Sequence, residues 1–477
     1  MNKMDRKTFL QKSIFSNTSA GLSGIASNYS SFRNPKDANS RPSALKITDI
    51  RGATLASIYD FPIIKIYTNQ GIIGLGEVRD AGWISQALML KPYLIGKDPL
   101  DIETILMSIR HLTGPGRYAG GYAAVDMALM DIAGKALGVP CWKLLGEKVR
   151  DEIEIYADCP VVTDSNNLKL MMKRRFDLGL KHYKIDLTPA LLKGFEGAIV
   201  NNLPTRKGLE IWGDHVQVAR DIVGYDVKLG ADHFGNMTVE SGIELGNYMA
   251  DPKFNLAYIE DVIEFTEYNA INFNRQITHG SKTPTLHGEN VFSFENLKPW
   301  IENNTVDIIH PDLLTSGGMI ETKKIADYAY QYGVNVMFHC ASSPIGVMAN
   351  VHTAATVIDF ISLESHTIEM PWVNDLVSGL QNPIIQNGVI PVPDTPGLGI
   401  ELIDEVAEKY LREEKYLAYK SGLFKPTPEF DKKMTMMEAR ENGLIGGYQQ
   451  SGGPWWHIND EGVYANQGGQ KKVVRSW

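Results

Sequence analysis

Three acidic residues in the middle of the chain recur at nearly equal intervals, each directly after a short apolar run. Asp232, Glu260 and Glu289 are separated by 28 and 29 residues, which is the length of one strand and one helix. One acidic residue after a strand is ordinarily a surface or capping group, but successive parallel strands of a barrel bring three to one face. Three hard anionic ligands suit Mg²⁺, which also keeps positions open for substrate oxygens. The spacing therefore predicts a Mg²⁺ site.

The same interval continues with a carboxylate and an imidazole. Asp312 and His339 are 27 residues apart, and each follows an apolar run. Neighbouring strand ends can place a carboxylate beside an imidazole, which fixes the ring tautomer and raises its basicity. We therefore expect a catalytic His–Asp dyad, with Glu364, 25 residues beyond His339, as a further hydrogen-bond or acid partner.

Two kinds of elements must position these residues. From Leu45 to Glu77, β-branched runs on either side of an Asn69-Gln70-Gly71 turn predict antiparallel strands, and small and apolar residues at helical spacing predict a helix over 122–137. This first α+β domain is expected to span 45–150. From 151 to 375, short apolar runs alternate with amphipathic stretches, and about eight such units in roughly 220 residues favour a closed βα barrel over an open sheet.

The end of the chain is expected to return from the barrel. The stretch 376–420 contains a predicted return strand, and 421–477 shows no clear periodicity, so we expect irregular structure there. The first 44 residues resemble a twin-arginine export signal with Lys7 in place of the second arginine, or else form a disordered arm. A functional signal would make the protein periplasmic; otherwise it is expected to be cytoplasmic.

Composition excludes several classes of protein. The 477 residues are 43% hydrophobic and 22% charged, which rules out intrinsic disorder. A net charge of -9 leaves no basic excess for nucleic-acid binding. The three cysteines form no CxxC pair, so any metal must be held by oxygen or imidazole. The sequence contains no run of 18 apolar residues, so no membrane span is predicted.

Six further motifs stand in the chain: Ala128–Lys135 with Gly138 and Pro140, Leu144-Leu145-Gly146, Ile259-Glu260, Gly288-Glu289, Gly317-Gly318 and Pro396–Gly399. Together they resemble the enolase superfamily, in its mandelate racemase/muconate lactonizing enzyme-like division. The resemblance spans about 45–402. It implies an α/β protein with a (β/α)7β TIM-like barrel and an α+β capping domain formed from both chain ends. It also implies Mg²⁺ on Asp232, Glu260 and Glu289, and a His339–Asp312 dyad.

The branch within this division is read from the second barrel strand. Many members carry Lys-x-Lys there, but this chain has Lys184-Ile185-Asp186, which argues against a two-base racemase that uses the second lysine. His339-Cys340 followed by Pro344-Ile345 is similar to D-galactonate dehydratases, yet this chain has His233 one residue after Asp232 and Phe234 where those enzymes have histidine. Lys184 is therefore expected either to complement His339 or to neutralise a metal-ligand carboxylate. Asp186 and His233 are the second choices for the group that complements His339.

The expected function is an acid-sugar dehydratase, a hydro-lyase, with a homo-oligomeric assembly and a small sugar acid as partner. Trp83, Arg117 and Tyr118 lie in glycine-rich loops of the first domain and are expected to contact substrate, although glycine turns alone would give this composition. A cycloisomerase of an anhydro-aldonate, a racemase or an epimerase of a related carboxylate is the nearest rival. A non-catalytic sugar-acid binding protein is the alternative from another class.

Overall fold

The computed structural model describes residues 44–57, 59–80, 82–235, 237–263, 269–414, 417 and 419–445, and the backbone of two strands at 455–458 and 464–467; the side chain of Arg117 is not described. The expected leader, 1–44, thus lies almost wholly outside the described residues. Within the described part of the chain, no helix combines the length and the hydropathy needed to cross a membrane.

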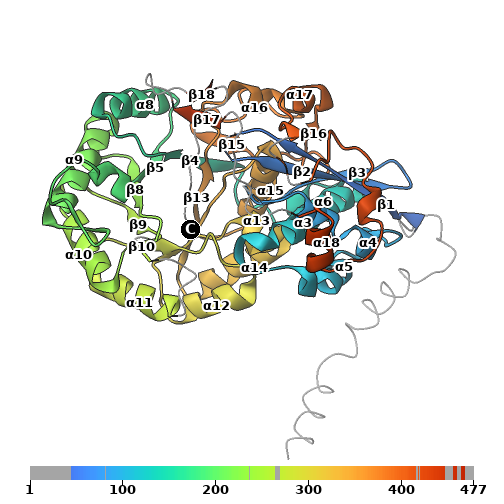
Figure 1. Ribbon diagram of the computed structural model, residues 1–477, viewed down its shortest axis with the longest axis horizontal. Coiled ribbons are helices and arrows are strands. Elements are labelled where there is room, and N and C mark those ends of the chain that lie inside the picture. Colours follow the sequence, from blue (N-terminus) through green and yellow to red (C-terminus); the bar gives the residue numbers. More distant parts are fainter. Residues whose placement is uncertain are drawn as a thin grey trace, which may run out of the picture. The chain divides into compact units, whose positions relative to one another are not determined.

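The first part of the chain forms an antiparallel sheet covered by a helix, as expected. The sheet has the order β1–β2–β3, and α6 packs on it (Figure 1). The helix ends where Gly138 adopts a left-handed conformation with φ 69°, which glycine allows without steric cost. We call this sheet and the helices that cover it the cap: β1 Ile47–Leu55, β2 Phe61–Thr68, β3 Ile73–Glu77, α3 Ser85–Leu88, α4 Lys91–Leu94, α5 Ile102–Ile109 and α6 Gly120–Leu137.

The predicted barrel is confirmed. Eight parallel strands form a closed ring, because β13 pairs with β12 on one side and with β4 on the other. They are β4 Glu152–Cys159, β5 His182–Asp186, β8 Lys228–Asp232, β9 Tyr258–Glu260, β10 Thr285–His287, β11 Ile308–Ile309, β12 Asn335–Phe338 and β13 Phe360–Ser365. Burial of almost every residue in these strands explains their continuous apolar runs in the sequence.

Helices follow the strands and surround the ring (Figure 1). They are α8 Ser165–Asp177, α9 Arg206–Val223, α10 Val239–Met249, α11 Ala270–Gly280, α12 Phe294–Glu302, α14 Gly318–Gln331 and α15 Pro344–Ala354. The register of the ring fixes the level of the candidate residues. Asp186, Asp232 and Glu260 are paired neighbours on β5, β8 and β9, so their backbones end at one height.

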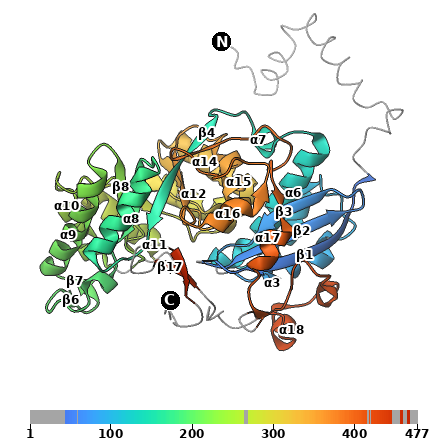
Figure 2. The same ribbon diagram turned by 90° about the horizontal axis from the view of Figure 1, so that it is seen from above.

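The segment after the barrel returns in two steps. β15 (Val389–Pro391) pairs antiparallel with the first barrel strand, β4. The chain then runs along the cap, where Arg412 N donates to Thr54 O at 2.8 Å and Phe424 N donates to Gly52 O at 3.2 Å. Figure 2 shows α17 (Asp404–Lys409) and α18 (Met436–Glu441) beside this sheet.

The C-terminal tail is more regular than its sequence indicates. Thr435 and Glu438 form a capping box that begins α18, and β17 (Trp455–Ile458) pairs antiparallel with β18 (Tyr464–Gln467). Such short elements contain too few residues for a periodic pattern, so the expectation of irregular structure over 421–477 is corrected there.

Two buried carboxylates attach the cap to barrel helices. Glu77, at the end of β3, accepts hydrogen bonds from Ser343 N at 2.8 Å and Gly346 N at 3.0 Å, at the beginning of α15. Asp126, on α6, accepts from Met319 N at 2.5 Å at the beginning of α14. Each carboxylate satisfies backbone N–H groups that a helix leaves unpaired in its first turn.

The cap has no room for a side chain at Gly76, where β3 meets α6. A Cβ on Gly76 would lie 2.0 Å from the carbonyl oxygen of Ala124. We expect Gly76→Ala to lower the free energy of unfolding by roughly 3 kcal/mol, because strand and helix backbones must separate. Gly71→Ala, in a turn where no atom lies within 4 Å but φ is +81°, should cost about 1 kcal/mol of backbone strain. Equal denaturant midpoints for the two variants would contradict this packing.

Candidate active site

The three predicted metal ligands lie at the carboxyl ends of consecutive barrel strands. Asp232 ends β8, Glu260 ends β9, and Glu289 follows β10 after Gly288. Carboxylate oxygens of Glu260 and Glu289 and a ring nitrogen of His310 all lie within 4.8 Å of one another. Asp232 and Glu260 are backbone neighbours across the two strands and share one cation, Lys184.

This site holds more carboxylate than fixed positive charge, which makes it suited to a cation. Burial raises the pKa of Asp232 to about 7; Lys184 opposes this, and Glu289 adds to it. Burial likewise raises the pKa of Glu260 well above its ordinary value. Glu260 Oε2 has no hydrogen-bond partner among the described residues. A buried oxygen of this kind is costly unless a metal or a proton satisfies it.

Lys184 lies at the centre of the buried carboxylates. Its Nζ is 2.7 Å from Glu364, 3.4 Å from Glu260, 3.5 Å from Asp232 and 3.7 Å from Asp158. Burial alone would lower the pKa of this amine, but Glu260 and Glu364 raise it well above its ordinary value. Lys184 is therefore a stable cation, and its geometry favours the neutralising role over that of a proton donor.

The expected dyad forms at the next two strand ends. Asp312 follows β11, His339 follows β12, and their backbones form a parallel bridge. His339 Nδ1 lies 2.6 Å from Asp312 Oδ2, and His339 Nε2 lies 3.2 Å from Glu289 Oε2. The bond at Nδ1 fixes the ring so that Nε2 faces the candidate metal ligand.

A cap residue reaches this dyad. Arg79, two residues after β3, is fully buried and ion-pairs with Asp312. Its guanidinium also lies 3.2 Å from Glu289 and 2.8 Å from His339 Nδ1. Arg79 was not among the site residues predicted from the sequence, although Trp83 lies only four residues further on. The structure directs Arg79 into the barrel, where it holds the dyad and Glu289 together.

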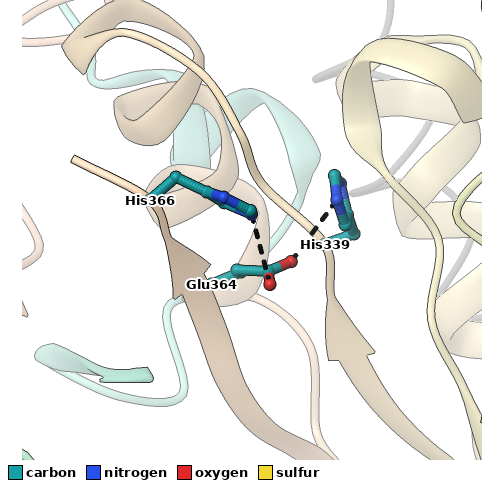
Figure 3. A group of neighbouring side chains, drawn as sticks. All are labelled: His339, Glu364 and His366. Carbon is teal, nitrogen blue, oxygen red and sulfur yellow. Dashed lines mark ion pairs between the residues drawn. The ribbon is translucent and has the colours of Figure 1, made fainter. Parts of the chain in front are cut away.

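Glu364 lies near the end of β13, as its spacing predicted. The structure places it between two histidines. His339 Nε2 is 3.5 Å from one of its carboxylate oxygens, and His366 Nε2 is 3.3 Å from the other. Figure 3 shows the two imidazole rings on either side of this carboxylate. His366 was missed in the sequence, although it follows Glu364 by only two residues, because the strand-end argument selects one residue per strand.

Asp158 and His310 were missed for related reasons. Asp158 lies in β4, the first barrel strand, and its Oδ2 is 3.0 Å from His366 Nδ1. His310, directly after β11, has Nδ1 3.1 Å from Glu260 Oε1 and Nε2 2.8 Å from the Tyr156 hydroxyl. His310 is the histidine of His310-Pro311-Asp312, so its position two residues before Asp312 was the signal that could have identified it.

Asp186 and His233, the second choices, have different surroundings. Asp186 is buried beside Asp232 in the barrel register. His233 Nδ1 lies 3.2 Å from the Glu260 carbonyl oxygen, its ring packs edge-on against Trp212, and burial lowers its pKa to about 4. This geometry favours a neutral imidazole that supports the strand end.

The two cap aromatic residues contact each other. The rings of Trp83 and Tyr118 are T-shaped with centroids 6.2 Å apart, and Tyr118 is 55% exposed. The 3-10 helix that carries Tyr118 (Gly116–Ala119) packs against α13 (Leu313–Ser316), which begins directly after Asp312. Their contact with substrate stays a prediction, and the side chain of Arg117 lies outside the described residues.

The ion pairs of Lys184 give a stability prediction. We expect Lys184→Met to lower the free energy of unfolding by about 3–5 kcal/mol, because it leaves buried carboxylates uncompensated. Lys173→Met is the matched control, since that lysine pairs with Asp177 at 2.9 Å on the exposed face of α8 and should contribute less than about 1 kcal/mol. Urea unfolding measures both, and an unchanged midpoint for Lys184→Met would refute the central role of this cation.

Comparison with known proteins agrees with the fold. Residues 35–146 match the mandelate racemase/muconate lactonizing enzyme N-terminal domain, and residues 168–406 match the enolase C-terminal domain-like family. A structure of a mandelate racemase/muconate lactonizing enzyme-like protein from Rubrobacter xylanophilus has a TM-score of 0.71 and 26% identity, covering 78% of this chain and 98% of that one.

Curated relatives indicate the kind of reaction. A D-xylonate dehydratase of Haloferax volcanii is 30% identical over 377 residues, covering 77% of this chain and 89% of the relative. A D-galactonate dehydratase family member of Musicola paradisiaca is 29% identical over 403 residues, covering 77% and 94%. The chain therefore belongs to the mandelate racemase/muconate lactonizing enzyme family of the enolase superfamily and is an enzyme of the lyase class.

Proposed function

We propose that this protein is a Mg²⁺-dependent acid-sugar dehydratase. It would remove the proton α to the carboxylate of an aldonate and eliminate the 3-hydroxyl, which gives a 2-keto-3-deoxy acid. The observation that carries the proposal is the His339–Asp312 pair, whose ring nitrogen Nε2 faces Glu289 among the buried carboxylates. The names of two relatives, a D-xylonate dehydratase and a D-galactonate dehydratase family member, support an aldonate as substrate.

The metal would be held by Asp232, Glu260 and Glu289. The raised carboxyl pKa values of Asp232 and Glu260 and the unbonded oxygen of Glu260 support a cation among the three, and an all-carboxylate donor set suits Mg²⁺ better than Zn²⁺. When bound, Mg²⁺ would stabilise the negative charge that develops on the substrate carboxylate as the α-proton leaves.

Each residue of the dyad has its own task. His339 Nε2 faces the candidate metal ligands and is placed to move the α-proton. Asp312 holds the ring through Nδ1 and stabilises the imidazolium that forms. Lys184, outside the dyad, lowers the pKa of Asp232 and Glu260 and so opposes the effect of their burial.

Incubation with a panel of aldonates and anhydro-aldonates tests the proposal. Purified protein with Mg²⁺ in D₂O should release a 2-keto acid from at least one aldonate. Deuterium incorporation at C2 without a 2-keto acid would identify an epimerase or a racemase instead. An isomerised anhydro-aldonate would identify a cycloisomerase, and tight binding with neither exchange nor product would identify a binding protein.

Metal binding should depend on Glu260. Glu260→Gln keeps the shape of the side chain but removes a charge, so we expect weaker Mg²⁺ binding in calorimetry and no measurable dehydration. The far-ultraviolet circular dichroism should stay that of the wild type. Unchanged Mg²⁺ affinity would show that the metal ligands are misassigned.

Turnover should depend on His339 more than on Asp312. His339→Asn retains polarity but cannot transfer the proton, so dehydration should fall by about 10²–10⁴ while substrate still binds in the presence of Mg²⁺. Asp312→Asn should lose less, because the ring remains but its orientation and basicity suffer. Wild-type turnover of His339→Asn on the best aldonate would rule out the dyad.

A further inference from the structure

A second histidine at the barrel mouth repeats the hydrogen-bond pattern of His339. His339 Nδ1 lies 2.6 Å from Asp312, and His366 Nδ1 lies 3.0 Å from Asp158. Their Nε2 atoms approach the two oxygens of the same carboxylate, Glu364, at 3.5 and 3.3 Å. The two ring centroids are 5.8 Å apart, and the rings lie on either side of this one carboxylate (Figure 3).

The two rings differ in solvent exposure from the carboxylate between them. The side chains of His339 and His366 retain 6% and 10% of their surface, whereas Glu364 retains none. The two imidazoles are therefore more accessible to a substrate than the Glu364 carboxylate between them. The ring of Tyr59, from the loop between β1 and β2, packs edge-on against His366 with centroids 5.6 Å apart and limits its rotation.

Dehydration needs two proton transfers, and the dyad supplies one. Lys184 is engaged with four carboxylates, which leaves the second role to another group. We propose that His366 is the general acid that protonates the departing 3-hydroxyl, with Asp158 as the residue that orients it. This inference rests on the proposed dehydratase function and adds a residue to it.

The charges around His366 agree with an acid. Burial alone would lower its pKa, but Asp158 and Glu364 raise it well above the ordinary value, so the ring carries a proton to donate. These two carboxylates, His339 and Tyr59 are the groups that the structure places against it.

The step balances without any further reactant. His339 takes the C2 proton, and the electron pair of that C–H bond passes first onto the substrate carboxylate and then forms the C2–C3 double bond. The C3–O bond breaks with its electron pair on oxygen, and His366 Nε2 gives that oxygen a proton, so water leaves. The resulting enol gains a proton at C3 and loses the proton of its 2-hydroxyl to solvent as it becomes the 2-keto acid. Both imidazoles then return to their starting states by exchange with solvent.

Three measurements on His366→Asn separate an acid from a structural ion pair. In D₂O with the best aldonate, dehydration should fall by about 10²–10⁴, whereas deuterium exchange at C2 should persist because His339 is intact. Elimination from the 3-deoxy-3-fluoro analogue should also persist, because fluoride leaves without needing a proton. His339→Asn should lose all three activities.

Controls make each outcome decisive. His279→Asn, at an exposed histidine of α11, should leave all three activities unchanged. Asp158→Asn keeps the His366 ring and should show the same selective loss to a smaller degree, which preserves the test if His366→Asn does not fold. Wild-type dehydration by folded His366→Asn would overturn the inference. An equal loss of all three activities in both His366→Asn and Asp158→Asn would also overturn it. A wild-type enzyme that dehydrates no aldonate would instead overturn the proposed function.

Discussion

The burial of several carboxylates around one lysine constrains the rest of this structure. Lys184 contacts Glu364, Glu260, Asp232 and Asp158, which come from four different barrel strands. Such a group of charges is stable in a protein interior only if each carboxylate has a cation, a proton or hydrogen-bond donors. The barrel therefore has to close around this point. The carboxylates at its mouth favour the binding of a cation.

The cap completes this arrangement from outside the barrel. Arg79 provides a second buried cation, which ion-pairs with Asp312 and Glu289 and so joins the dyad to a candidate metal ligand. The same β3 strand anchors α15 through Glu77. A cap displaced by an ångström would thus remove both a helix cap and a guanidinium from the site. Fold stability and catalytic geometry depend on the same contacts.

The two imidazoles beside Glu364 give the site an internal symmetry that suits an elimination. Each ring has its Nδ1 next to a carboxylate of its own and its Nε2 next to an oxygen of Glu364. One ring can then act as base while the other acts as acid, because their neighbours differ. His339 lies next to Glu289, a candidate metal ligand, whereas His366 lies next to Asp158 and Glu364.

The sequence by itself determined the barrel, its strand order and the strand ends that carry Asp232, Glu260, Glu289, Asp312 and His339. It could do so because alternating apolar runs and helices leave a period of about 28 residues, and parallel strands place their ends on one face. Only the tertiary structure decided the partners: Lys184 as a shared cation, Arg79 turned inward, and His366 paired with Asp158. These contacts join residues that are far apart in the chain and depend on side-chain direction at one end of a closed barrel, which no local pattern records.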